Sequence, residues 1–199
     1  MGTMDAVVIF DLDDTLIDTR NVLLPLAMAR VSEAIGVPVD QLNDRGKHID
    51  ELLAPVDGLS DEQRAAAAEA WHRPEVPPLE PLPGARELLT ELRGRVRLFL
   101  LTRGHPARQK QKVKQCGLGP YFEDVVIRAF GSDGCKRDDI EAILARTGLP
   151  AARCAVVGDD PRDELRFASE LGCAAIEVPK TPLSDIAGIL TRSGLLSVS

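Results

Sequence analysis

The 199-residue chain has 24 Lys and Arg against 31 Asp and Glu, a formal net charge of −7, and 44% hydrophobic residues. This composition is typical of a soluble globular enzyme, with length enough for one domain carrying an insertion. The acidic balance disfavours nucleic acid and anionic membranes as partners. Because no apolar run reaches the roughly 18 residues of a membrane span, we expect a cytoplasmic protein.

The first predicted element is a buried strand that ends in acidic residues. Residues 7–10 are apolar and favour a β-strand, and Asp11, Asp13 and Asp14 follow within four positions. Burying carboxylates at the end of a strand costs free energy unless a cation is bound there. In an open α/β sheet, the edge formed by the carboxyl ends of the strands is also where ligands bind. For Asp14, a role in a turn or as a helix cap explains the residue as well as a functional role does. Asp11 and Asp13 are candidates for sharing one hard cation.

Residues 18–82 are predicted to form a helical insertion after this strand. Apolar residues between positions 24 and 35 recur at helical spacing. Ser60 is a predicted N-cap of an Ala-rich helix, with Gln63 three residues later. The proline-rich residues 73–83 predict the return linker. We expect the insertion to be a mobile lid over the sheet, with a plain helical layer of one domain as the alternative.

Predicted strands and helices alternate from residue 83 onward. The strands are expected at residues 96–101, 125–127, 155–157 and 174–178, and the helices at 84–93, 106–116, 137–147, 161–171 and 183–192. Strands that alternate with helices predict parallel pairing through right-handed crossovers. The chain is therefore expected to be an α/β protein.

Polar residues follow three of the predicted strands, and the carboxyl ends of parallel strands meet at one edge of the sheet. Asp11 follows the first strand in chain order, Thr102 the second and Asp159 the fourth. The Thr102 hydroxyl and nearby backbone N–H groups, with Gly104 allowing close approach, suit a phosphate oxygen. Taken alone, a threonine after a strand is more often a turn residue.

Charged residues near the predicted helices extend this pattern. Lys136 would supply a fixed positive charge, although a lone lysine among 24 basic residues is by default on the surface. Three acids lie where a predicted strand leads into a predicted helix: Asp159, Asp160 and Asp163. Capping of the helix could explain Asp160, but a cap does not need three acids. The helix expected at 106–116 has a predicted solvated face made of Arg108, Lys110, Lys112 and Lys114.

Taken in order, these segments resemble the four motifs of the haloacid dehalogenase superfamily, and most closely those of its phosphatases. Residues 11–16 match the first motif and residues 101–104 the second. Lys136 matches the third motif, and residues 158–160 with Asp163 match the fourth. Three positions depart from the superfamily pattern: Asp14 stands where many relatives have Gly, Arg103 where Asn is frequent, and Arg137 where Pro is commoner.

The resemblance spans nearly the whole chain and implies its fold. The superfamily has a Rossmann-like three-layer α/β core with a parallel sheet, which here would comprise residues 1–17 and 83–199. It often inserts a cap between the first two motifs, and residues 18–82 would form a small all-helical cap domain of this kind.

The resemblance also implies a reaction and a metal. Asp11 would attack phosphorus and form an aspartyl-phosphate. Asp13 would protonate the leaving alcohol and then accept a proton from the water that hydrolyses the intermediate. Mg²⁺ would be held by the Asp11 carboxylate, the Asp13 backbone carbonyl and Asp159. Asp160 and Asp163 would be further ligands or would support the ligands from behind.

The expected phosphate-binding residues are Thr102, Arg103, Gly104 and Lys136. The predicted function is hydrolysis of a small phosphorylated metabolite, with the oligomeric state left open. A dehalogenase is disfavoured, because a halide leaving group needs no proton and the pattern of the superfamily then lacks an acid at Asp13. A phosphomutase that uses the same residues is an alternative, and a non-catalytic relative that binds a metal or a protein is another.

Overall fold

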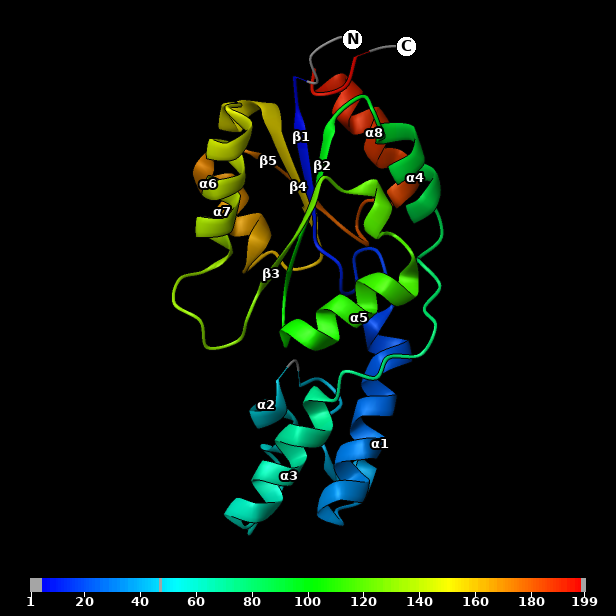
Figure 1. The fold of residues 1–199 in the computed structure, drawn as a ribbon, viewed down its shortest axis with the longest axis vertical. Helices are drawn as coiled ribbons and strands as arrows, with labels where there is room; N and C mark the ends of the chain where they lie inside the picture. Colours follow the sequence, from blue (N-terminus) through cyan, green and yellow to red (C-terminus); the bar gives the residue numbers. More distant parts are fainter. Residues whose placement is uncertain (1–4, 47, 198–199) are drawn as a thin grey trace. The chain divides into compact units, whose positions relative to one another are not determined.

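The computed structural model describes residues 5–46 and 48–197, and the chain divides into two compact units (Figure 1). The core unit contains Met1–Ile17 and Pro77–Ser199, and the helical unit contains Asp18–Val76. The second boundary lies before Pro77, whereas the sequence predicts it before Pro83. The linker joins the core unit early because the Leu82 N–H donates to the Leu16 carbonyl at 2.8 Å and Pro81 forms a β-bridge with Ile17.

The core unit is built on one parallel five-stranded sheet with the order β3-β2-β1-β4-β5. The strands are β1 (Val7–Phe10), β2 (Arg97–Arg103), β3 (Asp124–Arg128), β4 (Cys154–Gly158) and β5 (Ala174–Glu177). Strand β1 is central and fully buried, because it pairs with β2 on one side and β4 on the other. Whatever follows Phe10 therefore emerges between the ends of β2 and β4.

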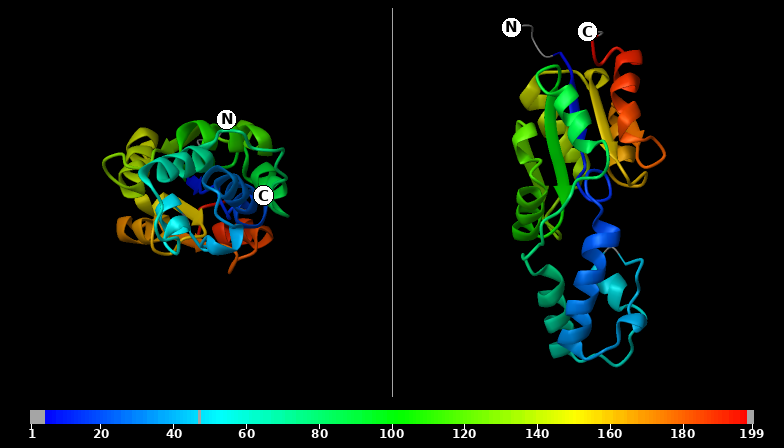
Figure 2. Two further views of the ribbon diagram at one scale, coloured as in Figure 1. Left: turned by 90° about the horizontal axis from the view of Figure 1, so that it is seen from below. Right: turned by 90° about the vertical axis from the view of Figure 1, so that its right-hand side faces the viewer.

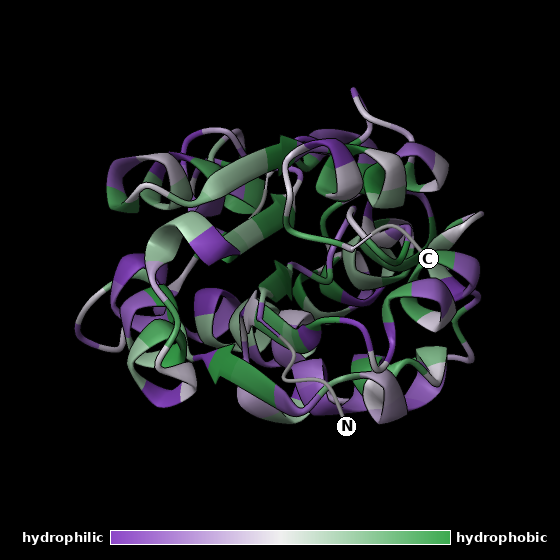
Figure 3. Cartoon of the chain, turned by 90° about the horizontal axis from the view of Figure 1, so that it is seen from above, coloured by the Kyte–Doolittle hydropathy of each residue, from purple (hydrophilic) through white to green (hydrophobic). Residues whose placement is uncertain are grey.

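Helices cover both faces of the sheet, which gives a three-layer α/β core (Figure 1). Helices α6 (Lys136–Thr147) and α7 (Glu164–Leu171) pack on the face formed by alternate residues of β1, β2 and β4. Helices α4 (Ala85–Leu92) and α8 (Leu183–Arg192) lie together on the other face. The strands are mostly hydrophobic (Figure 3), and the central strands β1, β2 and β4 are largely buried, as expected for strands covered on both faces. The predicted fold class is confirmed.

The helical unit has a hydrophobic core of its own. Helices α1 (Leu24–Ile35) and α3 (Asp61–His72) pack side by side, with the short helix α2 (Ile49–Leu53) beside them (Figure 2). The predicted cap of α3 is confirmed, because Ser60 Oγ accepts from the Gln63 N–H at 3.2 Å and Gln63 Oε1 accepts from the Ser60 N–H at 3.1 Å. None of the described residues of this unit lies in a strand, and no described helix is long and apolar enough to cross a membrane.

Two elements differ by two residues or more from their predicted bounds, and both differences change the site. Strand β2 continues two residues beyond its predicted end, so Thr102 and Arg103 belong to the strand and pair with β3. Helix α7 begins at Glu164 and not at Pro161, because residues 161–163 form a turn. The acidic segment after β4 is therefore mostly loop, and Glu164 becomes the first residue of the helix.

Candidate active site

Asp11 is the buried carboxylate at the centre of the carboxyl edge of the sheet. Its side chain lies just beyond β1, and its N–H donates to the Val157 carbonyl of β4 at 2.9 Å. Burial raises the pKa of Asp11 to about 8; Lys136 opposes the rise, and the carboxylates of Glu164 and Asp13 add to it. A further cation beside Asp11 would favour its ionised form, which is the form needed of a nucleophile.

Lys136, the first residue of α6, places its ammonium among buried carboxylates. Its Nζ donates to Glu164 Oε2 at 2.7 Å and to Asp11 Oδ1 at 3.0 Å, and lies 3.7 Å from Asp163 Oδ2. Although burial lowers the pKa of Lys136, the charges of Asp11 and Glu164 raise it above its usual value, so the ammonium keeps its proton. The structure thus brings together Asp11 and Lys136, which are 125 residues apart in the chain.

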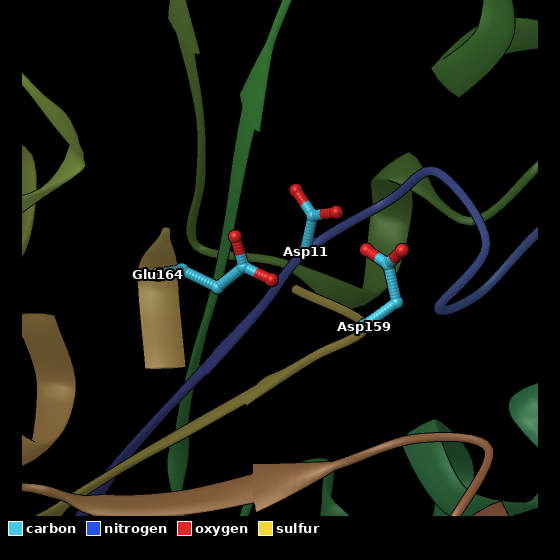
Figure 4. A group of neighbouring side chains, drawn as sticks. All are labelled: Asp11, Asp159 and Glu164. Carbon is cyan, nitrogen blue, oxygen red and sulfur yellow. The ribbon is translucent and has the colours of Figure 1, made fainter. Parts of the chain in front are cut away.

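Three carboxylates are grouped closely enough to hold one metal ion. Asp11 follows β1, Asp159 follows β4 and Glu164 begins α7 (Figure 4). Each offers one oxygen, and these oxygens all lie within 4.8 Å of one another. Hard oxygen donors in this arrangement fit Mg²⁺, which prefers carboxylates and water. The residues present therefore fit the expected metal, with Glu164 as a candidate ligand that the sequence analysis missed.

Asp160 and Asp163, which the resemblance implies as further ligands or as supports of the ligands, have contacts with other residues in the structure. Asp160 Oδ1 accepts from the Arg162 N–H at 2.9 Å, and the Asp160 N–H donates to Glu164 Oε1 at 3.0 Å. Asp163 Oδ2 lies near Lys136 and also 3.6 Å from Arg103 Nη2. Neither residue belongs to the group of three oxygens, so both are better described as neighbours that orient Glu164, Lys136 and Arg103.

Asp13 is held by two side chains of α5 (Pro106–Cys116). Lys112 Nζ donates to Asp13 Oδ1 at 2.6 Å, and Gln109 Nε2 donates to Asp13 Oδ2 at 2.8 Å. Residues three apart lie on the same face of a helix, so both donors reach one carboxylate. Gln109 and Lys112 are buried. The prediction that Lys112 belongs to a solvated face is therefore wrong, whereas Lys110 and Lys114 are exposed as predicted.

The end of β2 supplies Thr102 and the loop that follows it. Thr102 Oγ1 accepts from Gln109 Nε2 at 2.6 Å, which leaves its own hydrogen able to donate to a ligand. The Gly104 N–H already donates to the Arg128 carbonyl at 2.9 Å. A Cβ added at Gly104 would lie 2.9 Å from Gln109 Cδ. The absence of a side chain at Gly104 therefore leaves room for the Gln109 side chain in the site.

Asp14 occupies a turn and not the site itself. Its φ of 53° lies in the left-handed region, and its N–H donates to the Ile17 carbonyl at 2.8 Å. Asp tolerates this conformation better than most residues other than Gly. This explains how Asp can stand where many relatives have Gly, and it favours the turn alternative for Asp14.

The chain is similar to known proteins over most of its length. The family described as haloacid dehalogenase-like hydrolase matches residues 6–172. A glyceraldehyde 3-phosphate phosphatase of Methanocaldococcus jannaschii is 27% identical, over 90% of this chain and 87% of the relative. A probable phosphatase, IndB, of Dickeya dadantii is 34% identical, over 88% of this chain and 81% of the relative.

A solved structure has a similar fold. The crystal structure of a predicted phosphoglycolate phosphatase from Haemophilus somnus 129PT superposes with a TM-score of 0.74 at 16% identity, covering 95% of this chain and 99% of that one. The family match spans most of the sequence, from β1 to the end of α7, and includes every candidate residue described above. The chain belongs to the haloacid dehalogenase-like hydrolases.

Proposed function

We propose that the chain is a Mg²⁺-dependent phosphatase that hydrolyses a small phosphomonoester through an aspartyl-phosphate on Asp11. The observation that supports this most strongly is the contact of Lys136 with Asp11 beside the carboxylates of Asp159 and Glu164. A buried carboxylate next to a cation and to oxygen ligands for a metal is suited to attack on a phosphoryl group. Relatives that are named phosphatases support the same reaction.

The metal would be held by the carboxylates of Asp11, Asp159 and Glu164, together with the Asp13 backbone carbonyl that the resemblance implies. When bound, Mg²⁺ supplies positive charge that keeps these carboxylates ionised and offsets the charge of the phosphoryl group. Lys136 donates to Asp11 Oδ1, which fixes the orientation of the nucleophile and adds a second positive charge. Thr102 would donate its hydroxyl hydrogen to a phosphoryl oxygen.

In the first step, an Asp11 oxygen bonds to phosphorus while the bond from phosphorus to the ester oxygen breaks. Asp13, in its protonated form, gives its proton to that ester oxygen, so the product leaves as an alcohol. In the second step, water bonds to phosphorus, the bond from phosphorus to Asp11 breaks, and Asp13 takes the proton of the water. Gln109 and Lys112 orient Asp13 for both transfers.

The test is hydrolysis of p-nitrophenyl phosphate with Mg²⁺, with EDTA and in the Asp11→Asn variant. We expect Mg²⁺-dependent release of inorganic phosphate that Asp11→Asn removes, while the exposed Asp185→Asn variant behaves like the wild type. Activity that survives in Asp11→Asn would contradict the proposal. Transfer of phosphate to an added alcohol in place of water would favour the phosphomutase alternative.

A further inference from the structure

Arg103 differs from the two lysines of the site in how it is paired. Lys112 and Lys136 are buried, and each donates a hydrogen bond to a carboxylate. The Arg103 side chain is 37% exposed, and its Nη2 lies 3.6 Å from Asp163 Oδ2, which is beyond hydrogen-bonding distance. Within the described part of the chain, no side chain or carbonyl accepts a hydrogen bond from this guanidinium. Its N–H donors are therefore available to a ligand.

A short series of contacts connects this guanidinium to the nucleophile. Asp163 Oδ2 lies 3.6 Å from Arg103 Nη2 and 3.7 Å from Lys136 Nζ, and Lys136 Nζ lies 3.0 Å from Asp11 Oδ1. Arg103 is also the residue directly after Thr102 at the end of β2. When the phosphoryl group of a small substrate is bound at Asp11, the rest of that substrate would therefore lie within reach of Arg103.

An aromatic ring fixes the guanidinium from one side. The Phe130 ring centroid lies 5.8 Å from Arg103 Cζ, within the range of a cation–π contact. Phe130 follows β3 and is 41% exposed, which is unusual for a large hydrophobic side chain of this chain. The ring limits the orientations of the guanidinium and offers an apolar surface to a short carbon chain.

We propose that Arg103 binds a second anionic group of the substrate, so that the preferred substrates are short phosphomonoesters that bear a carboxylate. The planar guanidinium can donate two parallel hydrogen bonds to the two oxygens of a carboxylate, which an ammonium does not match. Asp163 already lies beside it, so a carboxylate is tolerated at this place. The inference rests on the proposed phosphatase activity, which places the phosphoryl group at Asp11.

The test uses two pairs of substrates in which a carboxylate replaces a hydroxymethyl group. The pairs are 2-phosphoglycolate with 2-hydroxyethyl phosphate, and 3-phosphoglycerate with glycerol 3-phosphate. We expect wild-type kcat/KM to favour the carboxylate member of at least one pair by about tenfold. In Arg103→Gln, kcat/KM for that member should fall about tenfold more than for its neutral counterpart.

Arg166→Gln is the matched control. Arg166 also contacts a ring, Phe167 at 4.4 Å, and a carboxylate, Glu170 at 3.9 Å, but it lies on the exposed side of α7. The control should keep the wild-type preference. An equal loss for both members in Arg103→Gln would mean that Arg103 binds the transferring phosphoryl group, and this result would overturn the proposal. So would a preference that Arg103→Gln leaves unchanged.

Binding to Asp11→Asn separates this inference from the proposed function. The dissociation constants of the same two pairs are measured by calorimetry with Mg²⁺, in Asp11→Asn alone and combined with Arg103→Gln. A carboxylate preference that disappears in the double variant supports the subsite even if the wild type hydrolyses none of the four esters. Absence of any such preference in the Asp11→Asn protein overturns the subsite, whatever the turnover shows.

Discussion

Two lysines contact Asp11 and Asp13 of the first motif, and the groups around these two acids differ in charge. Lys112 meets one carboxylate, Asp13, whose second oxygen accepts from the neutral amide of Gln109. Lys136 meets Asp11 and Glu164, with Asp163 and Asp159 close by. Lys112 pairs with the single carboxylate of Asp13, whereas Lys136 has several carboxylates around one ammonium. On the proposed function, a bound cation would offset the excess of negative charge around Asp11.

The largest effect is expected from Lys136→Met. This substitution leaves Asp11 and Glu164 buried without their ammonium, and the loss of one side of a buried ion pair costs about 3–5 kcal/mol. It also removes a charge beside the transferring phosphoryl group, which is worth about 10²–10³-fold in kcat. Chemical denaturation and steady-state kinetics measure the two effects. A variant of normal stability and activity would contradict the role given to Lys136.

Lys112→Met is expected to have a smaller effect on stability than on activity. Asp13 is partly exposed, so its carboxylate can be hydrated when the ammonium is lost, and we expect a cost of about 1 kcal/mol. Because Asp13 would lose the donor that Lys112 supplies, kcat should fall about 10²-fold. The exposed Lys110→Met and Lys114→Met variants of the same helix are the controls and should match the wild type. An equal loss in all three variants would indicate a general effect of the charge of the helix.

Gly104→Ala should produce a still smaller change by displacing Gln109. The new methyl group would meet the Gln109 side chain at 2.9–3.0 Å, and that side chain can move. We expect kcat to fall about tenfold, with little change in KM, because Gln109 joins Thr102 to Asp13. Gly188→Ala, within α8, is the matched control and should keep full activity. Wild-type kinetics in Gly104→Ala would show that Gln109 is not needed to orient Asp13.

The strand ends could be predicted from the sequence, and they account for much of the candidate site. Asp11 and Asp159 directly follow apolar strands, and Thr102 is the second-last residue of another; parallel strands bring such positions to one edge. Lys136 could be placed only through the resemblance to the superfamily, because nothing in its own surroundings distinguishes it from a surface lysine. The family and the fold class follow from the same residues and are confirmed.

The helical contributions could not be predicted, for two physical reasons. Glu164 was missed because the helix was expected to begin at Pro161, and a shift of three residues changes which acid faces the site. Gln109 and Lys112 were missed because α5 is basic on nearly every side, so its inner face has no hydrophobic pattern. Its buried residues, Gln109, Lys112 and Cys116, recur at helical spacing, but only Cys116 is apolar, so the hydrophobic pattern of the sequence does not indicate the other two.

Calorimetric titration of the protein with Mg²⁺ in the absence of substrate tests the metal site most directly. We expect one saturable site in the wild type, which Asp159→Asn and Glu164→Gln each weaken strongly. Asp160→Asn should bind Mg²⁺ like the wild type, because Asp160 does not belong to the group of three oxygens. A wild type that binds no Mg²⁺, or an equal loss in all three variants, would contradict the claim that these carboxylates form a metal site.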